Sequence, residues 1–164
     1  MNKFFKISVV ITLSIMCIAG LSYAETVDIP KLVENFKNST DLQRTAMINE
    51  TIGKETTASG KVINAEEYDL FDTTNDVKGT FYRVSTEAQK TPNNTAYQVY
   101  FLFKDKDKAA GFSKGENITK DGKVMQINDE RLLVSVWVYC AELNDTDKVL
   151  FRQSQPAMQT QSLP

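Results

Sequence analysis

The chain has 164 residues, with 19 basic and 21 acidic side chains and no histidine. An acidic chain without a long basic stretch is a poor general nucleic-acid binder, because neutralisation of phosphates drives that affinity. The lack of histidine in the sequence excludes Ser-His-Asp and Cys-His catalysis and removes the commonest metal ligand.

The first 24 residues predict a secretory signal peptide. Residues 2–6 are a short basic start, residues 7–21 are apolar and uncharged, and Ser22-Tyr23-Ala24 places small residues at the two positions that a signal peptidase reads. The apolar run is short for a membrane span, so a retained N-terminal helix is the weaker alternative. We therefore expect cleavage after Ala24, no membrane span in the mature chain, and a periplasmic or secreted bacterial protein.

Cleavage there leaves 140 residues, of which 17 are basic and 21 acidic. This length suits one compact domain, expected over residues 25–151, and the glutamine-rich sequence over 152–164 predicts a disordered tail. Cys17 leaves with the leader, so Cys140 is expected to be the lone thiol of the mature chain. Its apolar surroundings favour a buried, unreactive side chain over a redox or intermolecular role.

Two short helices are predicted at the start of the mature chain. Apolar residues recur at helical spacing over residues 29–37. Thr40, followed by Gln43 three residues later, is the pattern of a capping box for a second helix, which Gly53 is placed to end.

After Gly53 the apolar period changes to two, which predicts strands. A short helix is predicted at 106–112, between the third and fourth strands. Gly60 and Gly122 are expected to bend the first and fourth strands, as the closure of a small five-stranded barrel requires. The five predicted strands cover residues 57–62, 79–85, 97–103, 115–129 and 132–143.

This order of elements resembles the OB-fold, and more specifically the tRNA_anti-like group of exported OB-fold proteins. The resemblance implies a mainly β, five-stranded Greek-key barrel preceded by one or two short helices, with a helix between strands three and four. It covers roughly residues 29–143, and segment 66–79 departs from the tight loop expected between the first two strands. The group's function is largely unassigned and its name implies no tRNA ligand. The residues that carry the resemblance are Ile52-Gly53-Lys54, Ser59-Gly60-Lys61-Val62, the run 99–103, KDKDKAAGFSKGENITKDGKV and LLVSVWVYCAEL.

Acidic residues after the first strand raise two chemical alternatives. Glu66 and Glu67 with Asp69 or Asp72 could form a catalytic carboxylate pair. Asp72, Asn75 and Asp76 could supply oxygen ligands to Ca²⁺. A solvated loop and a plain turn are the favoured interpretations, so we expect no enzyme, no metal site and no cofactor.

The predicted ligand-binding surface is aromatic and lies on the second and third strands. If Tyr82 and Val84 face inward with Val99, Phe101 and Phe103, alternation places their neighbours outward. Barrels of this type bind ligands across these strands. The alternative is that an N-terminal helix covers this face and makes it core. The predicted ligand-binding residues are Phe81, Arg83, Gln98 and Tyr100, with Trp137 and Tyr139 as secondary candidates.

Flat aromatic rings beside an arginine suit stacking on sugars, bases or peptide side chains. The sequence therefore favours a non-catalytic periplasmic binding module for a peptide, an envelope protein or an oligosaccharide. The alternative is a structural or accessory subunit of an envelope assembly, and a hydrolase is third.

Overall fold

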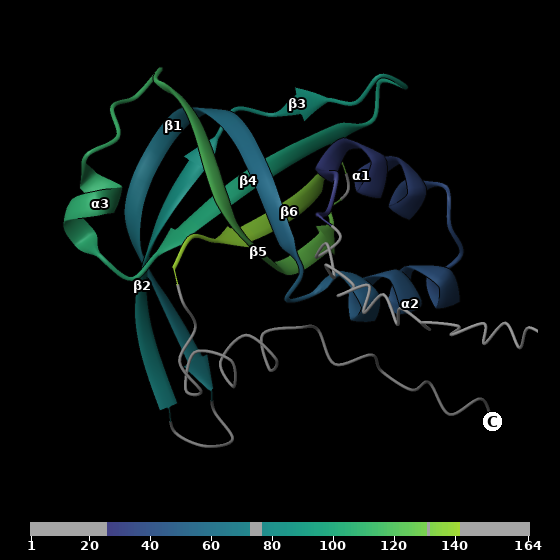
Figure 1. The fold of residues 1–164 in the computed structure, drawn as a ribbon, viewed down its shortest axis with the longest axis horizontal. Helices are drawn as coiled ribbons and strands as arrows, with labels where there is room; N and C mark the ends of the chain where they lie inside the picture. Colours follow the sequence, from purple (N-terminus) through teal and green to yellow (C-terminus); the bar gives the residue numbers. More distant parts are fainter. Residues whose placement is uncertain (1–25, 73–76, 131, 142–164) are drawn as a thin grey trace, which may run out of the picture.

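The computed structural model describes residues 26–72, 77–130 and 132–141 (Figure 1). The expected leader at 1–24 and the tail at 152–164 lie outside these ranges. Within them, no helix is long and apolar enough to cross a membrane. The described elements are α1 (Ile29–Lys37), α2 (Asp41–Thr51), β1 (Glu55–Asp72), β2 (Val77–Thr86), β3 (Gln89–Lys90), β4 (Ala96–Phe103), α3 (Lys106–Ala110), β5 (Asn117–Asp129) and β6 (Val134–Tyr139).

Both predicted N-terminal helices are confirmed, with the expected end signals. The Asp28 side chain accepts a hydrogen bond from the Lys31 amide at 3.0 Å and so caps α1. At the start of α2, Gln43 Oε1 accepts from the Thr40 amide at 2.9 Å. The chain leaves α2 through Gly53, whose φ of +85° is a left-handed conformation that favours glycine.

Five strands form a closed ring. β1 pairs with β2 and β5, β2 pairs with β4, β4 pairs with β6, and β6 pairs with β5. Only the β4–β6 pair is parallel among the described pairings of strands. The mainly β fold is thus confirmed, but the described sheet has six strands rather than five. The additional strand, β3, is two residues long and pairs with β4 at the edge.

Gly60 and Gly122 lie where long strands change partners. β1 pairs with β5 up to Lys61 and with β2 from Val62, and β5 changes from β1 to β6 at Lys123. Figure 1 shows both strands curving strongly across the ring. A Cβ at Gly60 would lie 2.5 Å from Cγ2 of a buried threonine on β2, and one at Gly122 would lie 2.5 Å from a carbonyl oxygen of β6. Neither position has room for a side chain.

The expected loop after residue 62 is instead strand. β1 continues to Asp72 and pairs with β2 in a register that places Glu66 opposite Arg83 and Tyr68 opposite Phe81. The predicted first strand, 57–62, was therefore too short. The outer parts of β1 and β2 project together beyond the other strands (Figure 1). Because a two-stranded ribbon is marginal by itself, the packing of Leu70 and Phe81 on its apolar face explains its stability.

Buried apolar residues form two clusters on opposite faces of the strands. The inner cluster lies inside the ring and includes Val84, Val99, Phe101 and Phe103, as alternation predicted. The apolar face of α1 belongs to this inner cluster: Ile29, Leu32, Val33 and Phe36. The outer cluster consists of Leu70, Phe81, Leu102, Met125, Trp137 and Tyr139, with Tyr68 and Tyr100 partly buried against it.

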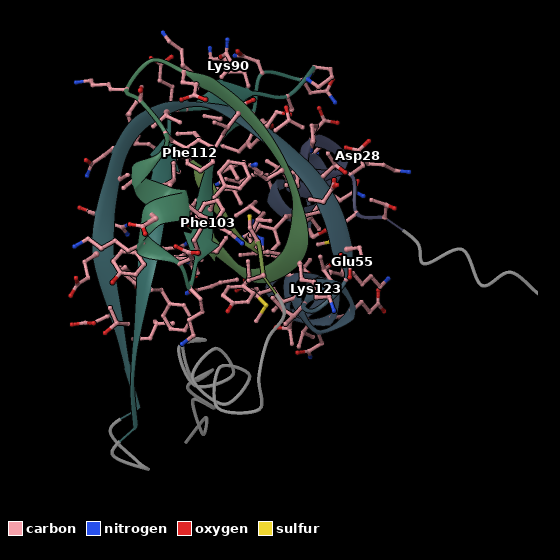
Figure 2. All side chains as sticks on the ribbon, turned by 60° about the vertical axis from the view of Figure 1, so that its left-hand side comes forward. Asp28, Glu55, Lys90, Phe103, Phe112 and Lys123 are labelled. Carbon is pink, nitrogen blue, oxygen red and sulfur yellow. The ribbon has the colours of Figure 1, made fainter. Side chains whose placement is uncertain are left out.

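Helix α3 and a few charged pairs complete the fold. Ala109 of α3 is in the inner cluster, and Phe112 after the helix packs on Phe103 with ring centroids 5.6 Å apart (Figure 2). Figure 2 also shows Glu55 beside Lys123, whose Nζ lies 3.4 Å from Glu55 Oε1. These contacts tie the start of β1 and the segment after β4 to the ring.

Candidate binding site on the outer face of the ring

Arg83 lies among three aromatic rings on the outer face. Its guanidinium carbon is 4.8 Å from the centroid of the Tyr68 ring, 5.2 Å from that of Tyr100 and 5.4 Å from that of Trp137. The Trp137 ring is in turn 5.1 Å from Tyr68 and 4.8 Å from Tyr100, centroid to centroid. We call these four residues the arginine–aromatic site. Distances of this size are those of cation–π and aromatic pairing.

Strand pairing brings these side chains together. Tyr100 of β4 is directly opposite Trp137 of β6, and β2 carries Arg83 between β1 and β4. Alternation along β6 sends Val136 and Val138 into the inner cluster and Trp137 to the outer face. The site therefore depends on the closed ring, since four different strands each supply one residue.

An ion pair holds Arg83 in place. Arg83 donates through Nε to Glu66 Oε1 at 2.9 Å and also through Nη2 to the same oxygen. Asn64 Nδ2 donates to the other oxygen, Oε2, at 3.1 Å. The carboxylate considered above as half of a catalytic pair thus has both oxygens engaged, and the charges of Glu66 and Arg83 offset each other.

Tyr100 links the rings to a polar margin. Its hydroxyl donates to Gln98 Oε1 at 2.9 Å, and Gln98 Nε2 donates to the Thr86 carbonyl at 2.6 Å. Burial raises the pKa of Tyr100, and the negative charge of Glu130 raises it further, against the opposing effect of Arg83. Tyr100 is therefore neutral and a hydrogen-bond donor at physiological pH.

Two polar groups of β6 have no hydrogen-bond partner among the residues that the structure describes. Trp137 is 7% exposed, and its Nε1 is buried without an acceptor. Ser135 is fully buried, and its Oγ is unpartnered as well. A buried polar group without a partner costs about 1–3 kcal/mol, so such groups call for an explanation.

The structure brings together only some of the predicted site residues. Arg83, Tyr100 and Trp137 meet directly, and Gln98 adjoins Tyr100. Phe81, Trp137 and Tyr139 were expected at the surface, and that expectation is wrong: Phe81 and Tyr139 are 0% exposed and Trp137 is 7% exposed. Phe81 and Tyr139 pack edge to face at 6.0 Å. Alternation correctly assigned Phe81 and Tyr139 to the outer face, but it does not predict how deeply a side chain is buried. The outer face is apolar where these two residues lie.

The alternative prediction, that an N-terminal helix covers this outer face, is also wrong. The outer cluster contains no residue of α1 or α2, and the apolar face of α1 is in the inner cluster instead. Sequence reasoning missed Tyr68 because it assigned residues after 62 to a loop. The alternation of Tyr68 and Leu70 with acidic residues was the available signal.

The described residues offer little for metal binding. No group of three or more His, Cys, Asp or Glu in the described ranges is placed to hold a metal ion. Of the calcium alternative, Asn75 and Asp76 lie outside the described residues, and the side chain of Asp72 is not described either.

Cys140 follows β6 and packs partly buried against the inner cluster. Burial raises the pKa of its thiol from the ordinary 9.0 to about 12. Near pH 8 this lowers the thiolate population about a thousandfold, and the thiolate is the reactive form. We expect an aromatic disulfide reagent to label the native protein at least about a hundredfold more slowly than the denatured protein. Equal labelling rates in the two states would show that Cys140 is a reactive thiol.

Comparison with known proteins gives a distant likeness of fold. No family model and no curated protein matches the chain. A solved structure, described as that of a "putative nucleic acid-binding lipoprotein" from Klebsiella pneumoniae, is similar with a TM-score of 0.44 and 14% sequence identity. The similarity covers 69% of this chain and 87% of that one.

Proposed function

We propose that the chain is a non-catalytic, exported binding module of the OB-fold type, which holds a peptide, an envelope protein or an oligosaccharide at the arginine–aromatic site. The observation that carries the proposal is the meeting of Tyr68, Tyr100 and Trp137 around Arg83 on the outer face. Tyr68 and Tyr100 are half-buried and Trp137 is 7% exposed. Aromatic rings and arginine are the residue types that dominate binding energy at protein surfaces.

The connectivity of the ring supports the OB-fold type. The first ring strand, β1, lies between the second, β2, and the fourth, β5, while the third, β4, runs parallel to the fifth, β6. Helix α3 lies between β4 and β5. This is the arrangement expected of a five-stranded Greek-key barrel whose second and third strands carry the ligand face. Export to the periplasm or beyond rests on the sequence of residues 1–24.

Three features support a binding role over a hydrolytic one. The chain has no histidine to act as a general base. Glu66 is engaged by Arg83 and Asn64, and the raised pKa of Cys140 removes a thiolate nucleophile. Nucleic acid is not proposed as the ligand because the mature chain has more acidic than basic residues.

The test compares capture of envelope components by matched variants. Tyr100→Ala is expected to reduce capture of a specific component by the mature protein about tenfold or more, because it removes a ring that the ligand stacks on. Leu42→Ala is the control, since Leu42 is an exposed apolar residue of α2, 85% accessible, outside the site. Both variants should keep the wild-type circular dichroism spectrum. Equal capture by Tyr100→Ala and the wild type would contradict a binding role for this site.

A second candidate function is favoured by one observation. Phe81, Leu102 and Tyr139 are fully buried on the same outer face, which is how a structural subunit would use the ring as a scaffold. If Leu42→Ala and Tyr100→Ala both leave capture unchanged, a structural or accessory subunit of an envelope assembly becomes the better proposal.

A further inference from the structure

The charges around the arginine–aromatic site do not balance. Arg83 and Glu66 form an ion pair on the outer face, so their charges largely offset each other. Glu130, which follows β5, is exposed, and its carboxylate has neither a cation nor a hydrogen-bond donor among the described residues. These three side chains therefore leave one negative charge uncompensated.

The other described charges near the β5–β6 turn are already paired. Asp129, the residue before Glu130, accepts a hydrogen bond from Arg44 Nη1 at 2.9 Å and also contacts Lys37 Nζ. Arg44 Nη1 lies 3.9 Å from Asp41 Oδ1 as well. Two basic and two acidic side chains balance in this cluster, so it does not compensate the charge of Glu130.

Strand pairing brings Glu130 to the end of the outer face toward which Tyr100 leans. The residue before Glu130 pairs with the first residue of β6, which in turn pairs with Tyr97 near the start of β4. The Tyr100 hydroxyl donates to Gln98, two residues closer to that start. The carboxylate and the half-buried tyrosine ring thus belong to one surface.

The electrostatic effects on Tyr100 agree with this placement. After burial, Glu130 has the largest effect on the pKa of Tyr100, and it raises this pKa more than Arg83 lowers it. Glu66 raises the pKa further. These three charges therefore produce a net negative potential at the tyrosine. An aromatic ring also attracts a cation to its face, so both effects favour a positively charged group in the ligand.

An exposed apolar residue lies in the same turn as the carboxylate. Leu132 is 89% exposed, and the Glu130 amide closes the turn by donating to the Leu133 carbonyl at 2.9 Å. Covering an exposed leucine is favourable because apolar surface leaves water. A polypeptide that carries apolar and basic side chains side by side can cover Leu132 while its basic group reaches Glu130. A small polyamine has no apolar side chain for this contact.

From these observations we propose that this end of the outer face binds a basic peptide segment of a partner protein. A lysine or arginine side chain of the segment pairs with Glu130 and lies against the Tyr100 ring, and a neighbouring apolar side chain packs on Leu132. This inference names the ligand class of the proposed function and rests on it.

Calorimetry with synthetic probes tests the ligand class. A peptide of repeated Lys-Leu-Gly units should bind the mature protein saturably at low salt, and its affinity should fall as sodium chloride is added, because exposed charges are screened. The same peptide with glutamate or glutamine in place of lysine should show no saturable binding. Spermine should bind at least about tenfold more weakly than the lysine peptide, since it lacks the leucine side chains.

Three substitutions probe the proposed contacts. Glu130→Gln should weaken binding of the lysine peptide about threefold, as expected for an exposed ion pair. Tyr100→Leu keeps an apolar side chain but removes the aromatic face, and it should also weaken binding about threefold. Leu132→Ser should weaken it about fivefold through the lost apolar contact. Circular dichroism spectra establish that each variant is folded.

Two further variants separate a local effect from the net charge of the protein. Asp107→Asn removes the same charge as Glu130→Gln, but from an exposed position of α3, which packs against the inner cluster, and it should leave the dissociation constant unchanged. Arg131→Gln removes the positive charge next in sequence to Glu130, so it should tighten binding. Weaker binding by Arg131→Gln would show that the turn attracts an anion instead.

Several results would overturn the inference while leaving the proposed function to its own capture test. If the glutamate peptide binds as tightly as the lysine peptide, or if no probe binds, the ligand is not a basic segment. Equal affinities for spermine and the lysine peptide would indicate a site for small cations. Equal effects of Glu130→Gln and Asp107→Asn would show that only the net charge matters and that the peptide has no defined place on the outer face.

Discussion

Replacing Gly122 with alanine is expected to lower the free energy of unfolding by about 3 kcal/mol or more, a large loss for a small domain. The added Cβ would lie 2.5 Å from the Tyr139 carbonyl oxygen and 2.8 Å from Val138 Cγ1. Since that carbonyl belongs to a neighbouring strand of the ring, the clash can be relieved only by separating β5 from β6. Chemical denaturation followed by circular dichroism measures the loss.

Gly111→Ala is the matched control for this substitution. Gly111 follows α3 with φ of −68°, and an added Cβ would lie 3.4 Å from the Asp107 carbonyl oxygen, an ordinary contact. Its free energy of unfolding should change by no more than about 0.5 kcal/mol. If both variants unfold at the same denaturant concentration, the close approach of β5 and β6 at Gly122 does not govern stability.

Phe81→Ala should be the most destabilising truncation on the outer face, at about 3–5 kcal/mol. The Phe81 side chain is 0% exposed, packs edge to face on Tyr139, and has Lys104 Nζ 4.2 Å from its ring centroid. Its removal leaves a cavity between the projecting β1–β2 ribbon and β4. Loss of the ribbon's apolar support should then also loosen the strand segment that carries Tyr68.

Tyr100→Ala, on the same face but only half-buried, should cost less, about 1–2 kcal/mol. Leu42→Ala should be close to neutral because Leu42 is exposed. Thermal and chemical denaturation of the three variants in parallel gives the ranking. If Phe81→Ala is as stable as Leu42→Ala, the outer cluster does not stabilise the fold. Phe81 would then count again as a surface residue.

Local signals predicted the helices and the faces of the strands well. The helical spacing over 29–37, the Thr40–Gln43 pair and Gly53 depend on neighbours within one or two turns, so they can be read directly from sequence. The alternation that sent Val84 inward and Arg83 outward is equally local. The first strand was predicted too short because acidic residues on one face of a two-stranded ribbon give a sequence that resembles that of a loop.

The sequence by itself determined the two N-terminal helices and their end signals, the mainly β class, the two obligatory glycines and the face of the sheet on which Phe81, Tyr100 and Phe101 lie. These follow from backbone conformation and from periodicity. Only the tertiary structure decided that β1 and β5 change partners beside Gly60 and Gly122, that Phe81 is buried while Tyr100 is half-exposed, and that Tyr68 and Trp137 meet at Arg83. These depend on the closure of the ring, which places residues up to about 70 positions apart in contact, and no local pattern encodes such long-range pairing.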